Sequence, residues 1–242
     1  MVDKTSRHIC RECQLPDLVC VCGIVEKINA PLTPIILQHP TESNHSKNTA
    51  RLINLVISNS NIYVGETADD FSEVIDKLNS KRVLLLYPSN NASVVIEECL
   101  NCRDGQSNSQ VQNIDTSVNS ILSYLNCSEQ CSRQVCYQNT LSQFDSVLLI
   151  DASWRKAKKI FHKNPWLHHL PHGQINLTGS SQYLIRKHSN ESSLSTLEAL
   201  MVLYKVINAP CYQNLNDIFN HFKLRKLASM PEHIRLKYLE VE

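Results

Sequence analysis

The chain has 242 residues, of which 42% are hydrophobic and 19% are charged, so it can build an apolar core and does not have the composition of a disordered protein. Its formal net charge of +1 lacks the basic excess by which many nucleic-acid-binding domains are identified. No apolar run approaches the roughly 20 residues that span a bilayer, and the N-terminus lacks the apolar stretch of a secretory signal, so we expect a cytoplasmic protein with no membrane contact.

The first 30 residues are rich in cysteine and are punctuated by proline. Cys10, Cys13, Cys20 and Cys22 form a C-x2-C and a C-x-C pair within thirteen residues. Four thiolates can close a tetrahedral zinc site, which would supply folding energy that so short a segment lacks. Such a site has no open position, so its zinc would be structural. The alternative is that these are free or buried thiols; without a secretory signal, a disulfide framework is disfavoured.

Beyond residue 30, short apolar runs alternate with segments of helical periodicity. Strands are predicted at 33–39, 61–64, 82–87, 146–150 and 174–178. Helices are predicted at 46–58, 70–78, 93–100, 154–162, 195–208 and 215–227. This alternation predicts an α/β fold with a mostly parallel sheet, in which ligands bind at the carboxyl ends of the strands.

Residues 101–143 interrupt the alternation. Asn, Ser and Gln dominate this stretch and the hydrophobic periodicity weakens, so we interpret it as a polar insertion with one helix near 118–125. Its cysteines are interpreted as ordinary thiols or as a second metal site.

The strand at 146–150 leads directly into Asp151, which has two interpretations. It caps the following helix, or it acts as a base at the edge of the sheet. Trp154, three residues further on, either stacks on a base or an adenine, or fills the core. Ser195 and Glu198 have the spacing of a capping box, and a helix start of this kind also binds carboxylates or phosphates.

Basic side chains are concentrated next to this strand. They are Arg155, Lys156, Lys158, Lys159 and Lys163. Such a stretch forms either a solvated helix face or a site for a polyanion, and its position beside the candidate site favours the polyanion.

Seven short motifs occur along the chain in an order typical of one family. They are Cys10-x2-Cys13-x2-Pro16-x3-Cys20-x-Cys22, Gln38-His39-Pro40-x-Glu42, Asn48-Thr49-x-Arg51-Leu52, Leu86-Tyr87-Pro88-Ser89, Asp151-Ala152-Ser153-Trp154, Tyr183-x-Ile185-Arg186-Lys187 and Leu194-Ser195-Thr196-Leu197-Glu198-Ala199. With these motifs the chain resembles the DTW-domain proteins, the tRNA-uridine aminocarboxypropyltransferases. It departs from them at Ser153, where threonine is usual, and in its long insertion.

The resemblance implies a SPOUT-like α/β domain with a mostly parallel sheet and a C-terminal knot. This catalytic domain would cover residues 31–242, with the insertion at 101–143, after a zinc-binding segment at residues 1–30. The implied reaction transfers the 3-amino-3-carboxypropyl group of S-adenosylmethionine to ring nitrogen 3 of a tRNA uridine and releases methylthioadenosine. Two alternatives stay open: a SPOUT-type RNA methyltransferase, and a non-catalytic zinc-containing RNA-binding protein. We expect a monomer.

The motifs also suggest a role for each candidate residue. The catalytic residues would be Asp151, as the base, with Ser153 and Trp154. Residues that would hold S-adenosylmethionine are Leu86, Tyr87, Pro88, Ser89, Tyr183, Ile185, Arg186, Leu194, Ser195 and Thr196. Residues that would grip tRNA phosphates are Lys156, Lys158, Lys159 and Lys187. The zinc ligands would be Cys10, Cys13, Cys20 and Cys22.

Overall fold

A computed structural model of the chain describes residues 8–43, 45, 48–88, 92, 94–99, 138–178, 194–233 and 235. The predicted helix at 118–125 and five candidate site residues lie outside these ranges. The five are Ser89, Tyr183, Ile185, Arg186 and Lys187.

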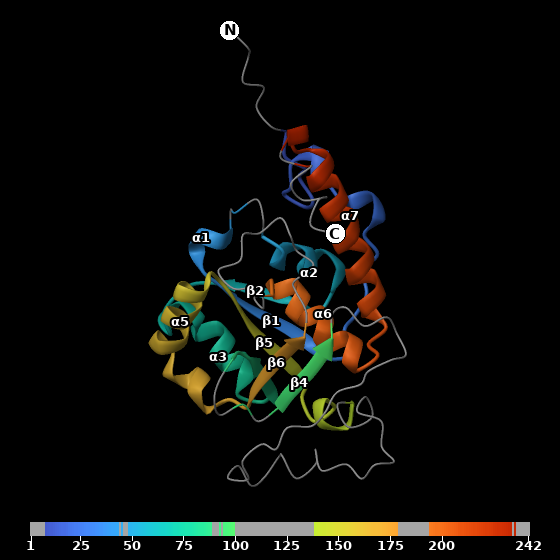
Figure 1. Ribbon diagram of the computed structural model, residues 1–242. Coiled ribbons are helices and arrows are strands. Elements are labelled where there is room, and N and C mark those ends of the chain that lie inside the picture. Colours follow the sequence, from blue (N-terminus) through green and yellow to red (C-terminus); the bar gives the residue numbers. More distant parts are fainter. Residues whose placement is uncertain are drawn as a thin grey trace.

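A six-stranded sheet forms the centre of the molecule (Figure 1). Its strands are β1 (Thr33–Gln38), β2 (Asn61–Val64), β3 (Val83–Leu86), β4 (Val94–Cys99), β5 (Ser146–Asp151) and β6 (His172–Thr178). They lie in the order β2-β1-β5-β3-β6-β4, and every neighbouring pair is parallel. The α/β class and the parallel sheet are thereby confirmed. The predicted knot stays a prediction, because the connection from β6 to α6, at 179–193, lies outside the described residues.

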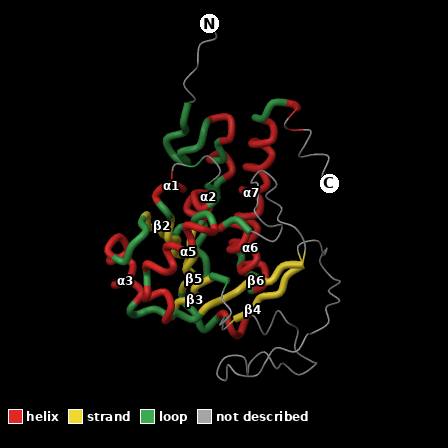
Figure 2. Tube along the Cα trace, turned by 60° about the vertical axis from the view of Figure 1, so that its left-hand side comes forward, coloured by secondary structure: helices red, strands yellow, loops and turns green. Residues whose placement is uncertain are grey.

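Helices cover both faces of the sheet (Figures 1 and 2). The longer helices are α2 (Ala50–Val56), α3 (Ser72–Leu78), α5 (Trp154–Lys163), α6 (Thr196–Val206) and α7 (Cys211–Ala228). Short helical turns are η1 (Asp17–Val19), η2 (Cys22–Ile24), α1 (Pro40–Ser43), η3 (Asp69–Phe71) and η5 (Pro165–His169). Along β1, Ile35 and Leu37 belong to the core under α3 and α5, whereas Ile36 belongs to the core under α2, α6 and α7. This alternation places a helical layer on each side of the sheet.

One element differs in type from its prediction. Residues 93–100 were expected to be helical, but residues 94–99 form β4, which pairs with β6 in the register Ile96 with Ile175. The run Val94-Val95-Ile96 consists of β-branched residues, which fit a pleated sheet better than a helix, and Val94 and Ile96 are buried. Within the described residues, the other predicted strands and helices are confirmed with shifts of a few residues at their ends.

The cysteine-rich segment packs against the body of the protein rather than standing apart. Leu15, Val19 and Val21 are buried in the same core as residues of α2, α6 and α7. Arg51 of α2 donates to the carbonyl oxygen of Gln14 at 2.6 Å and to that of Ser43 in α1 at 2.8 Å. Arg51 therefore links the cysteine-rich segment to α2 and to α1, the short helix that follows β1. No helix among the described residues is long and apolar enough to cross a membrane.

Candidate functional site

The carboxyl ends of two neighbouring strands meet the start of a helix at Asp151. Since β1 and β5 are parallel and adjacent, Gln38 and Asp151 lie opposite each other at the last position of their pairing. The Gln38 amide donates to Asp151 Oδ2 at 2.7 Å, and the Thr196 hydroxyl donates to Asp151 Oδ1 at 2.5 Å. Asp151 is only 6% exposed. Three segments far apart in sequence thus converge on one buried carboxylate.

The start of α6 carries the capping box expected from its sequence. Ser195 Oγ accepts from the Glu198 backbone N–H at 3.3 Å, and the Ser195 N–H donates to Glu198 Oε2 at 2.8 Å. Thr196 is the first residue of α6, so the Asp151 carboxylate lies at the positive end of the helix dipole. This position favours a negative charge on Asp151.

Ser153 and Trp154 begin the helix that follows β5. Ser153 holds the N-cap position of α5, two residues beyond Asp151, and its side chain makes no capping hydrogen bond. Trp154 is the first residue of α5 and is 49% exposed. The interpretation of Trp154 as a core-filling side chain is therefore wrong. Part of its side chain is accessible for stacking.

Three of the residues expected to hold the donor lie at the end of β3, next to β5. Leu86 pairs in register with Leu149 of β5, and Tyr87 and Pro88 follow it. The Tyr87 ring stacks on Phe161 of α5, with 4.5 Å between ring centroids and 9° between planes. Burial raises the pKa of Tyr87. Leu86–Pro88 and the start of α6 therefore both lie beside β5.

Two of the four lysines proposed for RNA binding, Lys156 and Lys159, already have carboxylate partners. Lys156 contacts the Thr41 hydroxyl and forms an ion pair with Glu42 at 3.2 Å. Lys159 pairs with Glu66 at 2.9 Å. Lys158, in contrast, is exposed and forms no ion pair within the described part of the chain.

Glu66, which the sequence analysis did not single out, is the centre of a charge network beside α5. Its carboxylate accepts from Lys163 at 2.5 Å, from Lys159 and from His39 Nε2 at 3.1 Å. Lys163 and Lys159 lower the pKa of Glu66 to about 2. Asn164, fully buried, donates to the Glu66 carbonyl oxygen at 2.9 Å. The network ties the end of β1 and the loop after β2 to α5.

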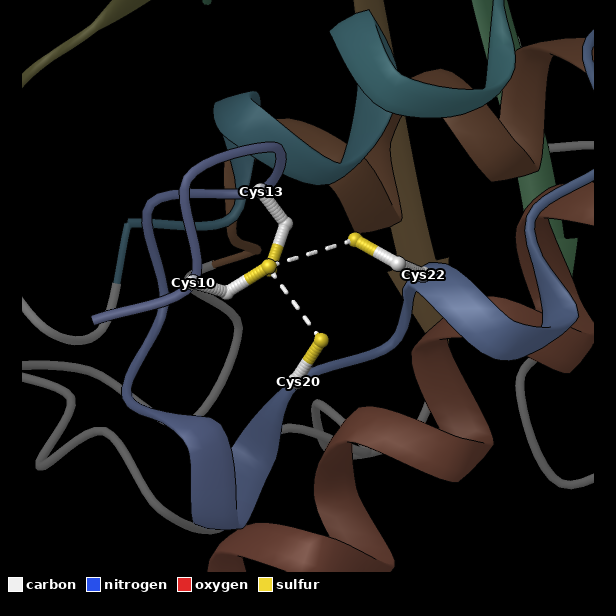
Figure 3. Close-up of side chains that lie close together, drawn as sticks. All are labelled: Cys10, Cys13, Cys20 and Cys22. Atoms are coloured by element: carbon white, nitrogen blue, oxygen red, sulfur yellow. Dashed lines mark hydrogen bonds between the residues drawn. The ribbon is translucent and has the colours of Figure 1, made fainter. Parts of the chain in front are cut away.

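The four N-terminal cysteines converge on one point (Figure 3). Their sulfur atoms all lie within 4.8 Å of one another, and the Cys10–Cys22 and Cys13–Cys20 pairs are each 3.7 Å apart. Sulfur atoms at the corners of a tetrahedron, about 2.3 Å from a central zinc, are about 3.8 Å apart. The spacing therefore suits a tetrahedral metal site.

The thiols of the cluster differ in acidity when no metal is bound. Backbone N–H groups of Cys13 and Glu12 lower the pKa of the Cys10 thiol to about 7. Burial raises the pKa of Cys13 and of Cys22. A bound cation would stabilise these two as thiolates, because metal ligation requires the deprotonated sulfur.

Comparison with known proteins finds one protein family and three relatives that share one name. The DTW domain family matches residues 7–227 of the chain. The chain is similar to tRNA-uridine aminocarboxypropyltransferase 2 of Drosophila melanogaster, with 28% identity over 241 residues that cover 96% of the chain and 75% of the relative. The proteins of the same name from Macaca fascicularis and Mus musculus are 26% and 25% identical over 213 residues. The chain spans 58% and 57% of these two relatives. No solved structure matches it.

Proposed function

The chain belongs to the DTW-domain family, and from this premise we propose that it is a tRNA-uridine aminocarboxypropyltransferase. The observation that carries the proposal is the convergence of the motif carboxylate, Asp151, with the ends of β1 and β5 and the start of α6. In a parallel sheet this is the edge at which ligands bind. The name that three curated relatives share supports the same activity.

The proposed donor is S-adenosylmethionine, whose sulfonium activates three carbon atoms. The enzyme selects among them by orientation, and here the aminocarboxypropyl chain has to face the acceptor. The N–H groups of Ser195 and Glu198 are used by the capping box, so those of Thr196 and Leu197 are the helix-start donors proposed for the donor's carboxylate. Arg186 is a second candidate for this carboxylate, and Leu86–Ser89 would frame the adenosine.

The proposed acceptor is ring nitrogen 3 of a tRNA uridine. A bond forms between this nitrogen and the propyl carbon, the carbon–sulfur bond breaks, and its electron pair leaves with methylthioadenosine. The proton of ring nitrogen 3 passes to Asp151, which is buried and accepts hydrogen bonds on both oxygens. Trp154 would stack on the base, which must be unpaired to enter the site.

The proposed contacts with RNA follow from the charge pattern of α5. Lys158 faces solvent without an ion pair among the described residues, so it would bind a phosphate directly. Lys187, which lies outside those residues, is proposed for the same role because of its motif. Lys156 and Lys159 would have to exchange Glu42 and Glu66 for phosphates on binding.

The cysteine cluster is proposed to bind a structural zinc. Four sulfur ligands leave no open position for a substrate, and the cluster belongs to the segment that packs on α7. When bound, zinc would supply folding energy to residues 8–30 rather than chemistry at Asp151. The family relationship also supports a SPOUT-like core with a C-terminal knot.

Incubation of the purified protein with unmodified tRNA and S-adenosylmethionine, followed by mass spectrometry of nucleosides, tests the proposal. The expected product is uridine heavier by an aminocarboxypropyl group; a methyl group would identify a methyltransferase. Asp151→Asn should bind the donor and lose most of the transfer, whereas Asp145→Asn, at the other end of β5 and exposed, should keep it. Full turnover by Asp151→Asn would remove this residue from the mechanism, and absence of donor binding by the wild type would favour a non-catalytic RNA-binding protein.

A further inference from the structure

Gln38 is a buried amide that contacts the Asp151 carboxylate from the neighbouring strand. It is 3% exposed, and it lies opposite Asp151 at the last position at which β1 and β5 pair. Its amide nitrogen lies 2.7 Å from Asp151 Oδ2. The neighbouring atom is a carboxylate oxygen, which only accepts hydrogen bonds. The Gln38 amide must therefore turn its NH2 group toward Asp151.

Thr196 contacts the other oxygen of the same carboxylate. Its hydroxyl donates to Asp151 Oδ1 at 2.5 Å from the first position of α6. Because a separate neutral donor holds each oxygen, rotation of the carboxylate about its last side-chain bond would break both hydrogen bonds. Neutral donors orient the carboxylate without cancelling its charge.

We propose that Gln38 and Thr196 are positioning residues that hold the Asp151 carboxylate in one orientation toward the acceptor base. This inference rests on the proposed function and extends it to Gln38, at the end of β1. Neither side chain needs to touch the reacting atoms. Their effect would appear in turnover, since a small misplacement of a reacting group can lower the rate about 100-fold.

The first test compares Gln38→Leu with Asn59→Leu. Both remove an amide that is hydrogen-bonded at an end of β1, but Asn59 binds Thr33 and Ala30 at the opposite edge of the sheet. Gln38→Leu should lower kcat about 100-fold with donor affinity, measured by calorimetry, changed less than about twofold. Asn59→Leu should lower the melting temperature and leave kcat at the wild-type value. Equal effects of the two variants on kcat would show that Gln38 is only structural.

The second test uses the hydroxyl of Thr196. Thr196→Val removes the donor to Asp151 and should lower kcat, whereas Thr196→Ser restores the hydroxyl and should recover most of the loss. If serine and valine at this position have the same kcat, the hydrogen bond does not position Asp151.

The third test is Gln38→Glu, which keeps the shape of the side chain and replaces its donor. Two ionised carboxylates in contact repel each other and no longer share a hydrogen bond, so the variant should be weakly active at neutral pH. As the pH falls, a protonated Glu at this position would donate the hydrogen bond that Gln38 gave, and the activity relative to wild type should rise. Because the activity is expressed relative to wild type at each pH, effects that are common to both proteins cancel.

The outcomes separate the two proposals. A wild-type protein that makes no aminocarboxypropyl-uridine refutes the proposed function and this inference together. An active wild type with an unaffected Gln38→Leu variant, or with a flat activity ratio for Gln38→Glu, refutes the inference alone.

Discussion

Removal of the zinc proposed for the cysteine cluster is expected to destabilise the whole protein. Leu15, Val19 and Val21 are each at most 2% exposed and belong to the core shared with α2, α6 and α7. Burial of one such side chain contributes about 2 kcal/mol, so release of the segment would forfeit about 6 kcal/mol. That is of the order of the total stability of a domain, which is about 5 to 15 kcal/mol. At about 2 to 4 °C per kcal/mol for a chain of this size, the melting temperature should fall by about 12 to 24 °C.

The assay is thermal unfolding before and after treatment with a strong chelator, with the zinc content measured in each sample. Re-addition of zinc should restore the melting temperature. Cys13→Ser should behave like the chelated protein, whereas Cys211→Ser, which changes a buried thiol at the start of α7, should keep one zinc per chain. A metal-free protein that melts at the same temperature as the zinc-bound protein would refute the assignment of a structural metal.

Two further predictions concern the charges beside α5. Lys163 and Lys159 lower the pKa of folded Glu66 to about 2 from an ordinary value of 4.5, so its ion pairs contribute stability above about pH 4.5 that is lost as the pH falls toward 2. Glu66→Gln should therefore lower the melting temperature at neutral pH, with a difference from wild type that shrinks through this window; a constant difference would contradict this. Lys158→Ala should reduce the salt dependence of tRNA binding by about one phosphate contact, whereas Lys163→Ala should change it less because Lys163 is held by Glu66. Equal salt slopes for wild type and Lys158→Ala would exclude Lys158 from the RNA interface.

The strands that build the site were predictable because each is a buried apolar run. β1, β3 and β5 lie at the centre of a parallel sheet, where both faces are covered, so their sequences are continuously hydrophobic. β4 was missed because it is an edge strand whose short run ends in Glu97 and Glu98, which a helix tolerates equally well. Giving the β-branched residues at 94–96 more influence on the secondary-structure prediction would have favoured a strand over a helix.

The partners of the candidate residues were less accessible to sequence analysis than the residues themselves. Asp151 and Ser195 were identified by their local motifs. Gln38 lies 113 positions from Asp151, and no local pattern links an amide to a carboxylate at that separation. Glu66 similarly meets Lys163 only after β2 and α5 have docked. Such contacts are set by the order of strands in the sheet, which composition and periodicity do not determine.

The pairing of β1 with β5 also bears on when this protein becomes competent during its synthesis. On the ribosome, β1 emerges more than one hundred residues before the strand that covers its inner edge, and Thr196 follows Asp151 by a further 45 positions. Contacts of such long sequence separation form slowly. A nascent chain that ends before α6 already carries the cysteine cluster and β1, yet it lacks the hydroxyl that completes the surroundings of Asp151. The proposed site is therefore completed only once the chain has been made as far as the start of α6.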